Sequence, residues 1–122
     1  MITHIKFVSI PVRDQDVALA FYTEKLGFEV LTDQPFGNGT RWIELAIPGA
    51  ETRLVLFTPP GQEYRIGTFS NMVFLCDDVE KTYEELRQRG VEFKTPPAKA
   101  SWGTSVQVID PDGNQLLLSS QR

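Results

Sequence analysis

The sequence predicts an α+β fold made of two tandem βαβββ modules, and three observations support this. A strand-like segment ending in acidic residues occurs twice, at residues 7–14 and 71–78. Each copy leads into a helical stretch that stops at a glycine, Gly27 or Gly90. Three further strand-like segments follow each helix. A repeat of this length indicates a duplicated module, and we expect equivalent strands of both halves to line one curved, half-open sheet cup.

In the first half, β-branched residues predict a strand over residues 5–12. Either Asp14 or Asp16 can cap the next helix by accepting hydrogen bonds from the free N–H groups of its first turn. Strands are then expected over residues 28–32, 41–47 and 53–58. Apolar residues at helical spacing predict the inner face of the helix, formed by Val17, Ala20, Phe21 and Leu26.

The second half repeats this plan after a polar linker over residues 59–67. A helix begins after Asp78 and is expected to bury Val79, Tyr83 and Leu86. The segment Asp110-Pro111-Asp112-Gly113-Asn114 predicts a tight turn, because proline presets the bend and glycine or asparagine accepts a positive φ. The expected strands cover residues 69–76, 91–94, 104–109 and 115–119. We expect one domain made of two modules, about 1–58 and 69–122.

Composition narrows the class of protein. The chain has 122 residues, of which 41% are hydrophobic and 23% charged, as is ordinary for one soluble globular domain. The net charge of −4 disfavours a nucleic-acid partner, which needs a basic surface. No apolar run reaches membrane-spanning length, so no membrane association is expected. The single cysteine, Cys76, excludes an intrachain disulfide, and with the absence of a signal-peptide pattern it predicts a cytoplasmic location.

The order of several short motifs makes the chain resemble a known superfamily. They are Val12-Arg13-Asp14, Leu26-Gly27-Phe28 and Arg89-Gly90-Val91, followed by the closing turn that ends at Asn114. In this respect the chain is similar to the vicinal oxygen chelate superfamily, which includes glyoxalase I, bleomycin-resistance proteins and ring-cleaving dioxygenases. The resemblance covers nearly the whole chain and implies the glyoxalase/bleomycin-resistance fold. It does not fix the chemistry, because this superfamily hosts several reactions.

The resemblance also implies where metal ligands would stand. Counting from the helix starts and from the closing turn places the four ligand positions at Phe7, Val55, Asn71 and Leu117. None is a histidine or a carboxylate, so we expect no bound metal and no cofactor. The only histidine, His4, stands three residues before Phe7 and would face the other side of the strand.

Strand alternation places Phe7 with Ser9, and Arg53 with Val55, in an apolar slot of the cup that has a few polar points. Trp42 and Trp102 each open the third strand of a half, beside the glycine and proline loops expected at residues 34–39 and 96–101. Both could stack on a flat ligand or cover the hydrophobic floor. Glu44 and Gln107 could face solvent or the ligand. The same positions could instead form a packed core. The candidate ligand-binding residues are Phe7, Ser9, Trp42, Glu44, Arg53, Val55, Phe57, Asn71, Val73, Trp102 and Leu117.

These features favour a protein that binds a small organic ligand, planar or, given the acidic balance, cationic. An alternative is a metal-independent lyase, isomerase or other superfamily enzyme, with Glu44, Arg53 or Tyr22 polarising the substrate. Metal-dependent glyoxalase or dioxygenase activity is disfavoured by the missing ligands. Whether the chain catalyses a reaction stays open at this point. A homodimer is expected, because a two-fold contact would cover the exposed sheet face and edge.

Overall fold

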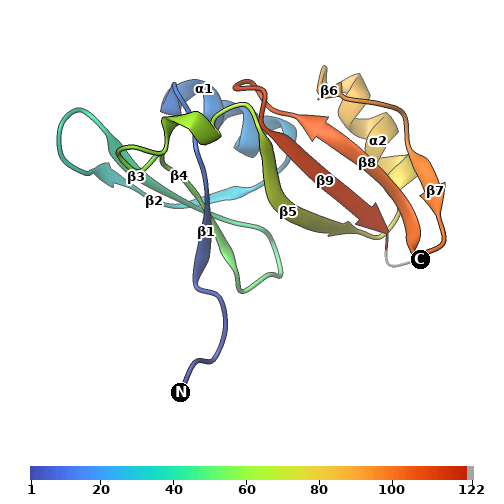
Figure 1. The fold of residues 1–122 in the computed structure, drawn as a ribbon, viewed down its shortest axis with the longest axis horizontal. Coiled ribbons are helices and arrows are strands. Elements are labelled where there is room, and N and C mark those ends of the chain that lie inside the picture. The colour runs from blue at the N-terminus through green and yellow to red at the C-terminus, as the bar shows by residue number, and fades with distance from the viewer. Residues whose placement is uncertain (121–122) are drawn as a thin grey trace. The chain divides into compact units, whose positions relative to one another are not determined.

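The computed structural model describes residues 1–120. The chain forms two compact units, one up to Ile66 and one from Gly67 onward. Each unit has its own sheet and its own principal helix (Figure 1). This is the predicted α+β fold of two βαβββ-type modules. No helix within residues 1–120 is long and apolar enough to cross a membrane.

The first unit has a four-stranded mixed sheet with the strand order β1-β4-β3-β2. Strand β1 pairs in parallel with β4, while β3 runs antiparallel to both β4 and β2. Strand β1 is shorter at both ends than the range of 5–12 that was expected, and β2 extends three residues beyond the expected end at residue 32. The elements are β1 (Phe7–Ile10), α1 (Gln15–Ala20), the π-helical turn η1 (Phe21–Lys25), β2 (Glu29–Pro35), β3 (Arg41–Ala46), β4 (Arg53–Leu56) and the 3-10 turn η2 (Glu63–Arg65).

Asp14 caps helix α1, as one of the two predicted alternatives. Its Oδ1 accepts hydrogen bonds from the backbone N–H groups of Asp16 at 2.9 Å and Val17 at 3.2 Å. The predicted inner face is wrong at Val17, which is 50% exposed, and at Ala20, which is also exposed, whereas Phe21 and Leu26 are half-buried. The fully buried residues are Ala18 and Tyr22, which lie four residues apart and therefore on one side of the helical stretch.

The core of the first unit lies on the side of the sheet that α1 covers. Alternate residues of three strands are at most 1% exposed there, as strand periodicity predicts. They are Ile10, Ile43, Leu45, Leu54 and Leu56. Residues of opposite parity therefore lie on the sheet face away from the helix, and this face carries the candidate site.

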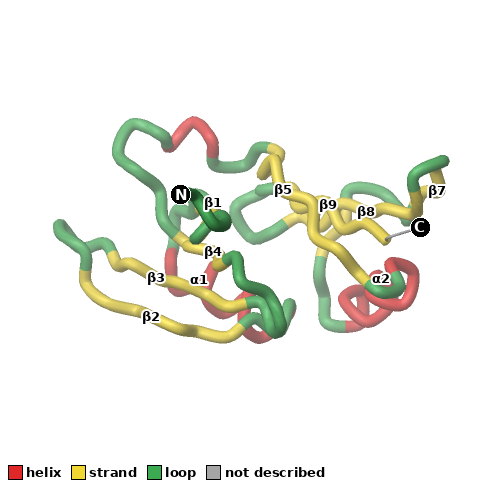
Figure 2. The backbone as a smooth tube through the Cα atoms, turned by 90° about the horizontal axis from the view of Figure 1, so that it is seen from below, coloured by secondary structure: helices red, strands yellow, loops and turns green. Residues whose placement is uncertain are grey.

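The second unit has a five-stranded sheet with the order β5-β9-β8-β6, and β7 pairs with β8. Figure 2 shows α2 on one side of this sheet. The prediction of a loop over residues 96–101 is wrong, because Ala98–Ala100 forms strand β7. The elements are β5 (Phe69–Cys76), α2 (Val79–Gln88), β6 (Glu92–Phe93), β7 (Ala98–Ala100), β8 (Gly103–Ile109) and β9 (Gln115–Ser120).

Helix α2 agrees with its prediction. Asp78 caps it by accepting a hydrogen bond from the backbone N–H of Lys81 at 3.0 Å. Val79 and Leu86 are buried, and the Tyr83 ring meets Phe93 edge-on at 4.7 Å between centroids. Cys76 lies on the helix-facing side of β5, and burial raises the pKa of its thiol, which makes it a poor nucleophile.

The closing turn between β8 and β9 holds a buried polar network. Asp110 accepts hydrogen bonds from the backbone N–H groups of Asp112 and Asn114 and from the side-chain amide of Asn114. Asn114 is 1% exposed, and its Oδ1 accepts from the backbone N–H of Gly67 at 2.7 Å. A Cβ on Gly67 would stand 3.3 Å from the carbonyl oxygen of Asp112, so this close approach favours glycine. The turn thus also anchors the start of the second unit.

Candidate functional site

Four aromatic rings of the first unit pack together on the sheet face away from α1. We call Phe7, Phe36, Trp42 and Phe57 the aromatic cluster. The Trp42 ring lies 5.3 Å from Phe7 and 5.4 Å from both Phe36 and Phe57, measured between ring centroids. Phe36 also meets Phe57 edge-on at 5.4 Å. Because Phe36 is 52% exposed, the cluster presents aromatic surface to solvent.

A carboxylate lies beside these rings and accepts a hydrogen bond at each of its two oxygens. Glu44 Oε2 accepts a hydrogen bond from the indole Nε1 of Trp42 at 3.2 Å, and Oε1 accepts from a terminal guanidinium nitrogen of Arg53 at 3.0 Å. The Glu44 side chain is 12% exposed and that of Arg53 is 48% exposed. The hydrogen bond from Arg53 holds the pKa of Glu44 below its ordinary value, against the opposing effect of burial. Glu44 therefore stays ionised and orients both Trp42 and Arg53.

Strand register brings the remaining predicted residues of the first unit to the same face. Ser9 pairs with Val55, and Val55 pairs with Glu44, so these three form a row across β1, β4 and β3. Phe7 pairs with Arg53 in the neighbouring row. Val55 is fully buried, whereas Ser9 keeps partial exposure. The predicted residues of the first half that share this face are Phe7, Ser9, Trp42, Glu44, Arg53, Val55 and Phe57.

The second unit exposes the equivalent sheet face. Residues of β5 alternate between exposed and partly buried, with Val73 62% and Leu75 67% exposed. Val73 pairs with Leu117, and Leu117 pairs with Gln107. The Oε1 atom of Gln107 is buried without a hydrogen-bond partner. This face mixes apolar residues with polar ones, since Ser119 and Gln115 have the same strand parity as Leu117.

Asn71 interrupts the regular pairing of β5. It is the one residue other than glycine in the described chain with a positive φ, 61°, and the register with β9 shifts between Phe69 and Val73. Such a bulge re-aims a side chain locally. The Asn71 side chain is exposed, at the position where the resemblance implied a metal ligand.

Two residues named from the sequence lie elsewhere than expected. Trp102 was expected to open a strand, but it stands in the two-residue turn that joins β7 to β8, since Ala100 pairs with Gly103. It is 51% exposed there. Tyr22 is fully buried on the helix, so it cannot contact a ligand on the opposite sheet face. The structure thus removes Tyr22 from the candidate catalytic groups.

The four positions implied for metal ligands do not fit a metal ion. Phe7, Val55 and Leu117 carry hydrocarbon side chains, and Asn71 offers only a neutral amide oxygen. Within residues 1–120, no three or more His, Cys, Asp or Glu side chains cluster closely enough to hold an ion. These four side chains therefore cannot form the ligand set of a catalytic metal ion.

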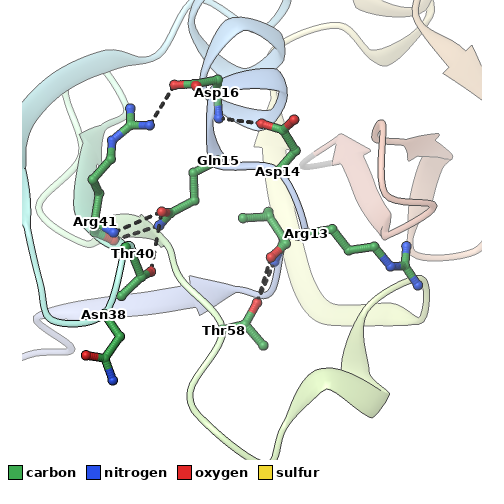
Figure 3. Close-up of a pocket in the computed structure, with 10 residues that line it drawn as sticks. Arg13, Asp14, Gln15, Asp16, Asn38, Thr40, Arg41 and Thr58 are labelled. Carbon is green, nitrogen blue, oxygen red and sulfur yellow. Dashed lines mark hydrogen bonds and ion pairs between the residues drawn. The ribbon is translucent and has the colours of Figure 1, made fainter.

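A separate hollow of about 400 Å³ lies where β1 leads into α1, beside the β2–β3 hairpin. Figure 3 shows the Gln15 side chain pointing toward Thr40 and Arg41. Gln15 bonds the backbone of Arg41 and Leu56, and the hydroxyl of Thr58 bonds both backbone groups of Val12. These polar groups fasten the hairpin and the strand ends to each other. The polar lining of the hollow is therefore already used in holding the fold together.

Sequence reasoning did not place Phe36 in the site. The loop containing it was recognised from its glycines, Gly37 and Gly39, which both have a positive φ. The backbone N–H of Phe36 bonds the carbonyl of Thr40 at 2.9 Å, so the hairpin closes immediately after this residue. The sequence feature that could have indicated Phe36 is an aromatic residue between Pro35 and Gly37 in an otherwise polar hairpin.

Fold and site together define a duplicated sheet protein with an exposed aromatic cluster and, within residues 1–120, no cluster of metal-ligating side chains. A model of the family described as Glyoxalase/Bleomycin resistance protein/Dioxygenase superfamily matches residues 2–118. The chain therefore belongs to this superfamily.

Individual relatives extend over nearly the full chain. The uncharacterized protein YetH of Bacillus subtilis (strain 168) is 42% identical over 118 residues, covering 97% of this chain and 98% of that protein. A solved superfamily member from Sphaerobacter thermophilus DSM 20745 is similar with a TM-score of 0.88 and 33% identity, covering 98% of both chains. TnmS3, an antibiotic binding protein from Streptomyces sp. CB03234, is similar with a TM-score of 0.86 and 37% identity, covering 98% of this chain and 96% of that chain.

Proposed function

We propose that this protein binds a small, ring-containing organic compound on the sheet face that carries the aromatic cluster. The observation that supports the proposal most directly is the combination of half-exposed rings with an oriented ion pair. Phe36 and Trp42 offer flat apolar surface, and Arg53 offers a directed polar group beside it. Binding sites for small molecules combine these two features.

The comparisons support the same class of function. TnmS3, which shares 37% of its sequence with this chain, is an antibiotic binding protein. The proposal carries over only the general idea of small-molecule binding. For the second unit taken by itself, we propose Asn71, Val73, Leu117 and Trp102 as ligand-contacting residues, and we propose a homodimer as the assembled form.

Binding is favoured over metal-independent catalysis because the candidate acid–base group is already committed. A general base works best when its pKa lies near the working pH. Both oxygens of Glu44 accept hydrogen bonds, and its pKa is lowered by Arg53. Tyr22, the other candidate acid–base group, is fully buried. These two observations support ligand binding over proton transfer by Glu44 or Tyr22.

Truncation of the exposed ring of the cluster tests the proposal. Phe36→Ala should weaken the binding of 2-naphthamide, a neutral planar probe, roughly fivefold or more, because a ring that contacts the ligand is lost. Isothermal titration calorimetry measures the change. Since Phe36 is half-exposed, the variant should stay folded, which a thermal melt verifies.

Tyr64→Ala is the matched control. Tyr64 is also an aromatic residue of the first unit, in η2, and it is 76% exposed. This variant should bind 2-naphthamide as the parent does. Equal affinities of Phe36→Ala and the parent, or no binding of the probe by the parent, would contradict the proposed function.

Metal analysis tests the remaining alternative. The purified protein is expected to hold no stoichiometric Zn²⁺, Ni²⁺, Mn²⁺ or Fe²⁺, because Phe7, Val55, Asn71 and Leu117 form no donor set. Elemental analysis after dialysis measures the ion content. About one tightly held ion per chain would show that the assignment of these positions is wrong.

A further inference from the structure

The charges around the aromatic cluster are unlike those of the whole chain. The chain as a whole carries −4, but the nearest carboxylate, Glu44, already accepts from both Trp42 and Arg53. Each oxygen of Glu44 keeps a further lone pair, but the side chain is only 12% exposed and its charge is already balanced by Arg53. A cationic ligand would therefore have to reach a nearly buried carboxylate whose charge is already paired.

Arg53, by contrast, has donors to spare. A guanidinium group carries five N–H donors in a planar fork, and Arg53 uses a terminal nitrogen for Glu44. Its side chain is 48% exposed, and strand pairing sets it directly beside Phe7 of the aromatic cluster. The bond to Glu44 restricts the orientation of the fork, which lowers the entropy cost of a further hydrogen bond.

A second cation reinforces this local field. The backbone carbonyl of Lys6 accepts from the backbone N–H of Arg53 at 3.2 Å, so the two residues are neighbours. The pKa of Glu44 is lowered first by the hydrogen bond from Arg53, then by the hydrogen bond from Trp42, and Lys6 adds the smallest contribution in the same direction. Arg53 is therefore the main positive group at this carboxylate.

We propose that the site selects planar aromatic compounds that carry a carboxylate or an equivalent anionic oxygen. The ring lies against Phe36 and Trp42, and the anion accepts hydrogen bonds from the free side of Arg53. Glu44 is a positioning residue, which holds Arg53 and Trp42 at the distances the ligand requires. This inference rests on the proposed function and specifies the ligand class for the same site.

Three naphthalene compounds with the same ring and different charges test the inference. They are 2-naphthoate, neutral 2-naphthamide and 2-naphthylmethylammonium. Calorimetry should show 2-naphthoate binding roughly tenfold or more tighter than the ammonium compound, because hydrogen bonds between two charged groups are stronger than neutral ones. The preference should shrink as salt is added.

Variants then assign the preference to Arg53. Arg53→Gln should weaken 2-naphthoate roughly tenfold and leave 2-naphthamide nearly unchanged. Arg53→Lys should restore part of the affinity for the anion, since it returns the charge without the planar fork. Arg87→Gln is the matched control, because Arg87 lies on α2 of the second unit, where it pairs with Glu84. It should leave the affinity for all three compounds unchanged.

The possible failures are distinguishable. If the ammonium compound binds as tightly as 2-naphthoate, the inference about charge is wrong while the proposed function stands. If Arg53→Gln keeps the full preference for 2-naphthoate, the anion is bound elsewhere and the inference is also wrong. If none of the three compounds binds, the proposed function itself fails, and the inference fails with it.

Discussion

Leu116→Glu is expected to unfold the protein, whereas Leu117→Glu is expected to leave it folded. The two residues are adjacent in β9 and face opposite sides of the sheet. Leu116 is 1% exposed and pairs with Val108, which is fully buried, so a carboxylate there would lose its hydration without gaining a partner. Such a buried charge costs several kcal/mol of a total stability of about 5–15 kcal/mol.

Leu117 lies beside Val73, which is 62% exposed, so water can reach a carboxylate at this position. Thermal melts followed by circular dichroism compare the two variants. A loss of the folded state in Leu117→Glu as severe as in Leu116→Glu would show that this face is a closed core. The proposal that Leu117 contacts a ligand would then be withdrawn.

Asn114→Ala is expected to destabilise the protein by about 2–4 kcal/mol, because it deletes two hydrogen bonds in a buried turn. The Asn114 side chain accepts from the backbone N–H of Gly67 at 2.7 Å and donates to Asp110 at 2.9 Å. Alanine would leave the N–H of Gly67 and the buried carboxylate of Asp110 without those partners. For a chain of this size, the melting temperature should fall by roughly 10 °C.

Asn38→Ala provides the comparison for this variant. Asn38 is exposed in the β2–β3 hairpin, so its truncation should change the stability by less than about 0.5 kcal/mol. Chemical denaturation of both variants measures the two free energies of unfolding. Similar losses in Asn38→Ala and Asn114→Ala would mean that the closing-turn network does not anchor the second unit.

The local features of the fold could be predicted because neighbouring residues determine them. Asp14 and Asp78 start the two helices through hydrogen bonds to backbone N–H groups two or three residues on. Gly27 and Gly90 end the helical regions because each adopts a positive φ, near 80° and 85°. Strand alternation likewise identified the exposed face of β5.

Parts of the candidate site could also be predicted. Parity alone grouped Phe7 with Ser9 and Arg53 with Val55, and register in the sheet confirms that these residues share a face. The alternation of side chains along a strand puts Trp42 and Glu44 on one face of the sheet but does not tell which face. Their contacts with Phe7 and Arg53 decide that question, since they depend on how β3 pairs with β4.

The sequence by itself therefore determined the duplicated plan, the start of the second helix, the closing turn and the absence of the expected metal donors, because these depend on residue type and short-range spacing. The tertiary structure decided the buried helix face, where Ala18 and Tyr22 point inward and Val17 does not. It also brought Phe36 from a hairpin onto Trp42 and joined Glu44 to Arg53. These contacts join residues of separate strands and loops, so they exist only once the sheet has formed and its register is set.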